Sequence, residues 1–123
     1  MFALTVRGNV YRKLKQYDNA LSNLNKALEI EPNNADTLGR RGEVYRLLSK
    51  YDSALDDFNK ALEIKPNDGY ALRRRGDVYR ILKRYDNALD DLNKSLEIKP
   101  NNAFALRSRE DVYRMRNQMF DIQ

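Results

Sequence analysis

The residues of this sequence that could do chemistry are arginines, tyrosines and paired aspartates, because the chain contains no histidine and no cysteine. Without these two residue types there is no Ser–His–Asp or Cys–His set, no thiolate metal site and no disulfide. The glycines stand singly, so the glycine-rich pattern of a phosphate-binding loop is missing as well. We therefore predict that the protein is not an enzyme and holds no cofactor and no metal.

Two pairs of neighbouring aspartates, Asp56–Asp57 and Asp90–Asp91, remain as candidates for a metal or proton site. Two adjacent carboxylates could bind Ca²⁺ or share a proton. Acids near the start of a helix also stabilise it, because they complement the positive end of the helix dipole. We interpret both pairs as solvated acids in the first turns of helices.

Four tyrosines recur at a fixed interval, and they could form a ladder on which nucleic-acid bases stack. Aromatic side chains at helical spacing more often pack in a core, and we predict that role here. Three other tyrosines, each followed by an aspartate, are predicted to wedge between helices at turns. The first set is Tyr11, Tyr45, Tyr79 and Tyr113, and the second is Tyr17, Tyr51 and Tyr85.

These residues belong to a sequence that repeats itself. Residues 72–100 recur about 34 residues earlier as residues 38–66 and again as residues 4–32, and a truncated copy starts at Leu106. A fixed period of this size indicates stacked supersecondary units. Each copy carries small, aromatic, apolar and proline positions in a constant order: Gly8, Gly42 and Gly76; Tyr11, Tyr45 and Tyr79; Ala20, Ala54 and Ala88; Leu24, Phe58 and Leu92; Ala27, Ala61 and Ser95; Pro32, Pro66 and Pro100.

This pattern resembles the tetratricopeptide repeat (TPR), a helix–turn–helix unit with the same spacing of small, aromatic and proline positions. The resemblance implies an all-α fold, a right-handed superhelical solenoid of three full repeats and a C-terminal half repeat. The repeats cover about residues 1–34, 35–68 and 69–102, with a partial copy at 103–123, and together they form a single TPR domain. Leucine stands where the family commonly has tryptophan, at Leu4, Leu38, Leu72 and Leu106.

Each repeat is predicted to contain a first and a second helix. The first helices are expected at about residues 2–15, 35–49, 69–83 and 103–117. The second helices end near Ile30, Ile64 and Ile98, where a proline follows two residues later. We predict that Asn33–Asn34, Asn67–Asp68 and Asn101–Asn102 turn the chain and cap the next first helix, and that Asp18, Asp52 and Asp86 are the N-caps of the second helices.

Glycine inside a helix costs about 0.5–1 kcal/mol relative to alanine, so its recurrence needs a packing reason. We predict that the missing Cβ lets the two helices of a repeat lie directly against each other. The last copy departs from this pattern, because Glu110 replaces the glycine and residues 116–123 replace the expected turn and second helix. The abrupt ends of the repeat pattern favour a piece of a longer array or an excised domain.

Charge is distributed unevenly between the two halves of each repeat. The first helices and their turns carry about 18 of the 23 Lys and Arg and about 5 of the 18 acids. In the TPR family the first helices line the concave surface, so the resemblance implies a basic groove, in which arginine suits a carboxylate or phosphate. The groove positions of the family carry over to Asn9, Arg12, Lys13, Arg40, Glu43, Arg46, Tyr70, Arg73, Arg74, Asp77, Arg80, Phe104, Arg107, Asp111 and Arg114.

Two features of these positions limit the prediction. Arg73–Asp77 and Arg107–Asp111 are spaced to pair along a helix and to neutralise each other in part. The branch of the family that binds chaperone tails uses a five-residue carboxylate clamp on three successive first helices. Asn9 and Arg74 match that clamp, whereas Thr5, Arg40 and Tyr70 stand where Lys, Asn and Lys are expected, which leaves a different acidic peptide open.

We predict a non-enzymatic protein–protein interaction scaffold that binds an acidic or carboxylate-bearing peptide segment in the basic groove. The alternative is a self-associating array that forms a homo-oligomer through its exposed terminal helices, either by docking on another copy or by domain swapping. A solvated, internally paired face without a ligand is also open, and the acidic second helices disfavour nucleic acid. No apolar run approaches the roughly 18 residues of a membrane helix and no signal peptide is recognised, so we expect a cytoplasmic or nuclear protein.

Overall fold

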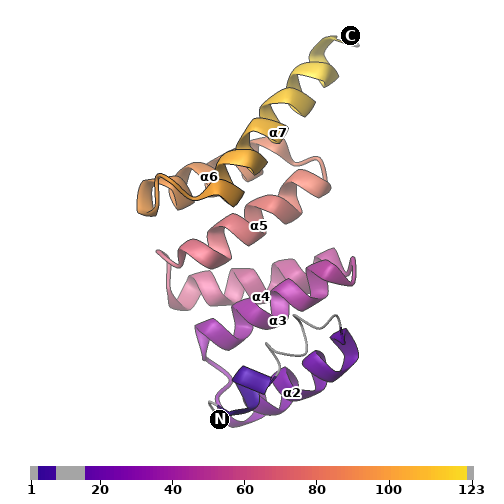
Figure 1. The fold of residues 1–123 in the computed structure, drawn as a ribbon, viewed down its shortest axis with the longest axis vertical. Helices are drawn as coiled ribbons and strands as arrows, with labels where there is room; N and C mark the ends of the chain where they lie inside the picture. Colours follow the sequence, from indigo (N-terminus) through magenta and orange to yellow (C-terminus); the bar gives the residue numbers. More distant parts are fainter. Residues whose placement is uncertain (1–2, 8–15, 122–123) are drawn as a thin grey trace. The chain divides into compact units, whose positions relative to one another are not determined.

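The computed structural model describes residues 3–7 and 16–121, the side chains of residues 120 and 121 excepted, and these residues form helices and short turns. Residues 3–7 are helical. The helices that follow are α2 (Tyr17–Ile30), α3 (Ala35–Leu47), α4 (Tyr51–Ile64), α5 (Gly69–Ile81), α6 (Tyr85–Ile98) and α7 (Ala103–Asp121) (Figure 1). The described residues contain no strand, so the predicted all-α fold class is confirmed.

The chain divides into two compact units, Met1–Pro66 and Asn67–Gln123. In the first unit, α3 packs against both α2 and α4. In the second unit, α6 packs against α5 and α7, and α5 also contacts α7 (Figure 1). The single domain predicted from the sequence stays a prediction.

The first helices of the repeats begin where the sequence predicts. Asn34 accepts a hydrogen bond from the backbone N–H of Thr37 through its side-chain oxygen, at 3.0 Å. Asp68 and Asn102 make the equivalent bonds to the N–H groups of Ala71 and Ala105, at 3.2 and 2.9 Å. Each bond satisfies a backbone donor that the helix itself cannot pair, which confirms the three predicted caps.

The N-caps of the second helices lie two residues earlier than predicted. The N-cap positions are held by Gln16, Lys50 and Arg84, and none of them caps the helix with its side chain. The prediction that Asp18, Asp52 and Asp86 are N-caps is therefore wrong. These aspartates lie in the first turn, where their charge still meets the positive end of the helix dipole. The helices end at Ile30, Ile64 and Ile98, as predicted.

The turns within the repeats are held by backbone bonds. After α3, the N–H of Lys50 bonds to the carbonyl of Tyr45 at 2.8 Å, and the N–H of Ser49 bonds to the carbonyl of Arg46 at 2.9 Å. This is a Schellman motif, which needs a left-handed residue after the helix. Ser49 and Lys83 supply it, with φ of 60° and 62°. The helices α3 and α5 therefore end two residues before the predicted Ser49 and Lys83.

Close packing of the two helices in a repeat depends on glycine. A Cβ at Gly42 would stand 2.8 Å from the ring of Phe58 on α4, and one at Gly76 would stand 2.9 Å from the side chain of Leu92 on α6. Real Cβ atoms do not come so close to a neighbour. The predicted reason for the recurring glycines is confirmed at both positions, whereas Gly8 lies outside the described residues.

The hydrophobic cores follow the predicted helical spacing. In the first unit, Ala20, Leu24 and Val44 form one buried cluster, with Tyr17 and Leu48 packed against it. In the second unit, a larger buried cluster joins α6 to α7, and Tyr79 and Met115 pack against it. The members of this cluster are Tyr85, Ala88, Leu89, Leu92, Leu96, Ala105 and Val112. The prediction that Tyr17 and Tyr85 wedge between helices agrees with these clusters.

The helix α7 differs from its equivalents. It continues to Asp121, past the predicted end at Asn117. Leu106 is 40% exposed, whereas Leu38 and Leu72 at the same repeat position are 2% exposed. Tyr113 is also 40% exposed, so its predicted core role is wrong, because no second helix of the described chain covers that side of α7. Tyr45 and Tyr79 are half-buried, and Tyr11 lies outside the described residues.

Candidate functional site

Arginine and aromatic side chains meet where α5 and α7 lie side by side in the second unit. Tyr70, Arg73 and Arg74 share one face of α5, because residues three and four apart are neighbours on a helix. Phe104 occupies the place of Tyr70 one repeat later, at the start of α7. We call these four residues the arginine–aromatic cluster.

The rings of this cluster hold the guanidinium groups. The Arg74 guanidinium carbon lies 5.4 Å from the centre of the Tyr70 ring and 4.3 Å from that of the Phe104 ring. The Arg73 guanidinium carbon lies 5.1 Å from the Tyr70 ring centre. A guanidinium over a ring face keeps its charge and its donors in a fixed plane. The cluster is therefore suited to bind a carboxylate or phosphate, and the exposed Arg107 on α7 adds a third positive charge.

Asp77 and Asp111, two acids predicted among the groove positions, hold arginines on their own helices. Asp77 is buried and pairs with Arg80 at 2.9 Å, and it accepts a hydrogen bond from the Ser108 hydroxyl on α7 at 3.4 Å. Asp111 pairs with Arg114 at 2.7 Å. Both aspartates thus pair with the arginine three residues later. The buried Asp77 thus bridges α5 and α7 and orients Arg80.

The first unit carries the equivalent positions on α3. Glu43 is buried and binds Arg46 with both carboxylate oxygens, at 2.6 and 2.8 Å. Arg40 lies 3.9 Å from the exposed Asp36. The hydroxyl groups of Thr5 and Thr37 lie 3.1 Å apart, which places residues 3–7 next to α3. Asn9, Arg12 and Lys13, the remaining predicted positions, lie outside the described residues.

Two partly buried ion pairs were missed by the sequence prediction. Arg41 on α3 binds Asp57 on α4 through Nε and Nη2, at 2.8 and 2.7 Å. Arg75 on α5 binds Asp91 on α6 through the same two nitrogens, at 2.7 and 2.8 Å. We call these two bidentate pairs the arginine clamps, because each ties the two helices of a repeat together. Both partners recur in the sequence with a constant separation, which is the signal that could have revealed them.

The clamps correct the interpretation of the paired aspartates. Asp57 and Asp91 are each 5% exposed and lie midway along their helices, so they are not solvated first-turn acids. Their neighbours Asp56 and Asp90 are exposed, as predicted. The hydrogen bond to Asp57 raises the pKa of Arg41, and that to Asp91 raises the pKa of Arg75, in each case against the lowering effect of burial.

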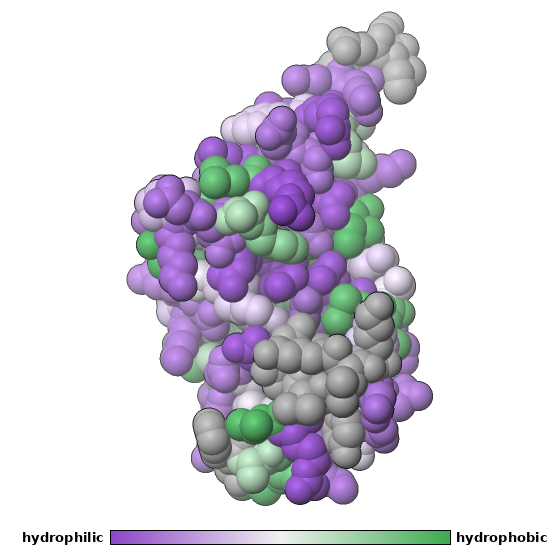
Figure 2. Space-filling model, in the orientation of Figure 1, coloured by the Kyte–Doolittle hydropathy of each residue, from purple (hydrophilic) through white to green (hydrophobic). Residues whose placement is uncertain are grey.

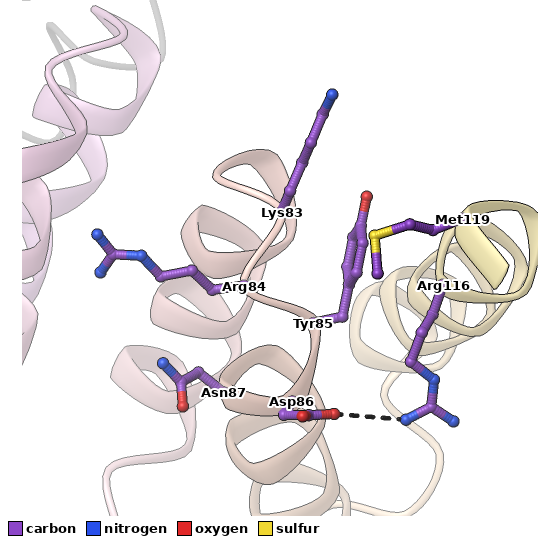
Figure 3. Close-up of a pocket in the computed structure, with 7 residues that line it drawn as sticks. All are labelled: Lys83, Arg84, Tyr85, Asp86, Asn87, Arg116 and Met119. Atoms are coloured by element: carbon purple, nitrogen blue, oxygen red, sulfur yellow. Dashed lines mark ion pairs between the residues drawn. The ribbon is translucent and has the colours of Figure 1, made fainter. Parts of the chain in front are cut away.

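The cavity drawn in Figure 3 lies between the turn before α6 and the C-terminal part of α7. Its volume is about 380 Å³, and Tyr85, Asp86, Arg116 and Met119 are among its lining residues. Arg116 lies 3.5 Å from Asp86, whereas the side chains of Arg84 and Asn87 point away from both (Figure 3). The polar groups therefore do not converge on one ligand atom, and the arginine–aromatic cluster remains the best candidate site.

Other kinds of site have little support in the described part of the chain. Residues 3–7 and 16–121 contain no group of three or more acids that could hold a metal ion. No described helix is both long and apolar enough to span a bilayer. The coloured part of the face drawn in Figure 2 is mostly hydrophilic, and its hydrophobic residues form small groups among the hydrophilic ones. Such a surface offers polar contacts and no broad apolar patch.

Comparison with solved structures gives close matches in fold. The first TPR domain of the human RPAP3 protein has a TM-score of 0.91 and 27% identity, over 98% of this chain and 94% of that one. The first TPR of Spaghetti (RPAP3), bound to the HSP90 peptide SRMEEVD, has a TM-score of 0.88 and 28% identity, over 93% and 90% of the two chains. The Arabidopsis OM64 TPR domain has a TM-score of 0.85 and 26% identity, over 89% and 91%.

Comparison with sequence families points the same way. A model described as tetratricopeptide repeat matches residues 2–67, and a second model of that description matches residues 69–102. A search of the curated proteins finds no match. The matched residues include the glycines, prolines and arginine clamps described above, and the solved structures share the helix order of both units. The chain belongs to the tetratricopeptide repeat family and has its all-α solenoid fold.

Proposed function

We propose that this chain is a protein–protein interaction module that binds an acidic peptide segment at the arginine–aromatic cluster. The observation that carries the proposal is the placement of Arg74 between the rings of Tyr70 and Phe104, with Arg73 beside it. A similar structure, with 28% identity, holds the HSP90 peptide SRMEEVD, whose sequence includes neighbouring glutamates and an aspartate. That likeness supports an acidic peptide as the class of ligand.

The chemistry of the cluster explains why a carboxylate would be preferred. Stacking occupies the faces of a guanidinium and leaves N–H groups at its edge, and two of these match the two oxygens of a carboxylate. The Tyr70 and Phe104 rings reduce the exposure of that charge to water, which strengthens its attraction for an anion. They also offer apolar contact to the side chains that flank the bound acid.

Two predicted groove residues of the second unit enter this proposal beside the cluster. Arg107 is the additional arginine that a longer peptide would meet there. Asp77 takes part as the buried partner that orients Arg80. Tyr70 stands where the chaperone-tail clamp has a lysine, so the ligand is expected to place its acids differently from the peptide of the similar structure.

The proposal is tested by fluorescence anisotropy with labelled acidic heptapeptides. One probe is SRMEEVD, and a further set separates two glutamates by one to four residues; amide analogues, with Gln and Asn in place of the acids, serve as neutral controls. We expect at least one acidic peptide to bind and its neutral analogue to bind about tenfold more weakly or worse, because charged hydrogen bonds are lost.

Variants then locate the bound peptide. Arg74→Ala should weaken binding about tenfold or more, and Arg74→Lys should not rescue it, because an ammonium lacks the planar, stacked fork. Arg84→Ala, which removes an exposed arginine outside the cluster, is the matched control and should bind normally. Equal affinities for the acidic and neutral peptides, or unchanged binding by Arg74→Ala with intact helicity, would overturn the proposal.

A further inference from the structure

One side of α7 carries four residues, Leu106, Arg109, Glu110 and Tyr113, which we call the open face. The equivalent residues on α3 and α5 are covered by the second helix of the repeat, where Gly42 meets Phe58 and Gly76 meets Leu92. On α7, Leu106 and Tyr113 are each 40% exposed. No second helix covers this side within the described residues.

Arg109 on the open face is already oriented for a partner. Its Nη1 donates a hydrogen bond to the side-chain oxygen of Asn93 on α6, at 3.0 Å. Arg41 makes the same bond from Nη1 to Asn25 on α2, also at 3.0 Å, and uses its Nε and Nη2 to bind Asp57. Within the described part of the chain, the Nε and Nη2 edge of Arg109 has no acceptor. Arg109 is thus half of an arginine clamp whose carboxylate is not supplied by these residues.

Glu110 changes which helix can complete the clamp. In both covered repeats the acid of the clamp is followed directly by the residue that packs on the glycine, as Asp57 precedes Phe58 and Asp91 precedes Leu92. At Glu110 the glycine is replaced by a side chain with a Cβ and a carboxylate. At Gly42 and Gly76 an added Cβ would stand under 3 Å from Phe58 and Leu92, so the same register against Glu110 leaves no room for a Leu or Phe. The fitting residue is therefore small.

We propose that the open face of α7 binds a partner helix that carries an aspartate or glutamate for Arg109, followed directly by a small residue opposite Glu110. The partner helix needs an acid because a carboxylate complements the charge of Arg109. It needs a small residue next to that acid because the side chain of Glu110 occupies the space that a glycine would leave open. Leu106 and Tyr113 supply apolar contact on either side. The second helices of another copy of this chain do not meet these requirements, because Leu24, Phe58 and Leu92 follow the corresponding position.

The test uses the full chain and peptides based on the α6 sequence, Tyr85–Ile98. The probe peptide carries Leu92→Ala, and a lactam between Asp90 and Lys94 keeps it helical, since an isolated 14-residue helix is marginal in water. The signals of the arginine Nε–H groups are followed by NMR during titration. We expect the probe to shift the Arg109 signal and to leave the Arg74 signal in place.

Matched peptides and variants separate the two requirements. A peptide that also carries Asp91→Asn should bind about tenfold more weakly or worse, because it cannot form the bidentate pair. The peptide with the natural Leu92 should bind poorly to the natural chain and well to Glu110→Gly, which restores the close approach. Arg109→Lys keeps the charge and the fold but loses the fork, so it should weaken binding of the probe even if Glu110→Gly folds poorly.

Several results would overturn the inference. The Asp91→Asn and Asp91 peptides could bind equally, the Leu92 peptide could bind the natural chain as well as the probe does, or the probe could shift Arg74 and not Arg109. A shift of the Arg109 and Leu106 signals with protein concentration alone would assign the open face to a second copy. Arg74→Ala should leave probe binding unchanged, so this test does not depend on the acidic-peptide proposal.

Discussion

The acids of the arginine clamps are expected to contribute to the stability of this chain, because they are buried and hydrogen-bonded. Asp91 is buried and accepts two hydrogen bonds from Arg75. Removing one partner of such a pair leaves the other charge poorly hydrated and without its partner, which costs more than the pair itself contributes. The neighbouring Asp90 is exposed, so the chain offers its own control one residue away.

We expect Asp91→Ala to lower the free energy of unfolding by about 3 kcal/mol, and Asp90→Ala to change it by less than about 0.5 kcal/mol. Urea unfolding followed by circular dichroism measures both. A double-mutant cycle with Arg75→Met isolates the pair. Equal effects of the two alanine substitutions would contradict the assignment of Asp91 as the clamp acid.

The contribution of the arginine clamps to the free energy of unfolding should not change with pH in the alkaline range. The pKa of Arg75 is raised in the folded chain, so its contribution to stability is complete below the unfolded pKa and is lost only as the pH rises through the folded pKa. The unfolded and the folded pKa of Arg75 both lie above the ordinary alkaline range. The coupling energy from the double-mutant cycle should therefore stay constant between about pH 7 and pH 10, and a steady decline over that range would argue against it.

Lys83, like Ser49, has a backbone conformation that lowers the stability of the folded chain. Its φ of 62° is a left-handed conformation in which a Cβ is unfavourable by about 1 kcal/mol. Lys83→Gly should raise the free energy of unfolding by about 0.5–1 kcal/mol. Lys65→Gly is the control, because Lys65 has a φ of −129° and gains nothing from glycine. Thermal unfolding of the two variants should separate them.

At the scale of helices, the distance between the two helices of a repeat is set by glycine. We expect Gly76→Ala to destabilise the chain by about 1–3 kcal/mol, because the new Cβ overlaps Leu92 and this outweighs the better helix propensity of alanine. Gly69→Ala is the matched control, since a Cβ there would meet Ile98 at an ordinary 3.7 Å. A stabilising Gly76→Ala would show that α5 and α6 can move apart at little cost.

The helices also mark the limit of prediction from sequence. The caps Asn34, Asp68 and Asn102 and the helix ends at Ile30, Ile64 and Ile98 were predicted, because local residue types decide them. The arginine clamps were not predicted, because the contact between two residues on different helices depends on how the helices cross. Asp57 and Asp91 therefore look like ordinary helix acids in the sequence. The exposure of Tyr113 was missed for the same reason, since it depends on a neighbouring helix.

For the chain as a whole, stability should be distributed over local contacts. In repeat proteins each element contacts its near neighbours, so a lesion acts mainly where it is made. We expect Asp91→Ala to reduce amide hydrogen-exchange protection most in α5 and α6, and the equivalent Asp57→Ala to reduce it most in α3 and α4. Mass spectrometry of peptic fragments resolves these regions. An equal loss of protection along the chain would instead indicate one cooperative unfolding event.

For the candidate site, the sequence predicted which residue types gather there, but not which of the predicted side chains are buried. Arginine on the first helices was expected from the uneven charge, and Arg73 and Arg74 do lie together with Tyr70 and Phe104 in the second unit. The sequence prediction assigned Glu43 and Asp77 to the groove, whereas both side chains are buried. Each pairs there with the arginine three residues later.

The guanidinium of Arg41 has a consequence for behaviour on heating. It extends from α3 to Asn25 on α2 and to Asp57 on α4, so one planar group spans three helices. The hydration that charged groups give up on burial becomes less favourable as the temperature rises, which makes their burial less costly. The hydrogen bonds of Arg41 to Asn25 and Asp57 should therefore lose less of their stabilising effect on warming than the apolar contacts around them. Warming is expected to fray helix termini first, while the centres of α2, α3 and α4 remain joined.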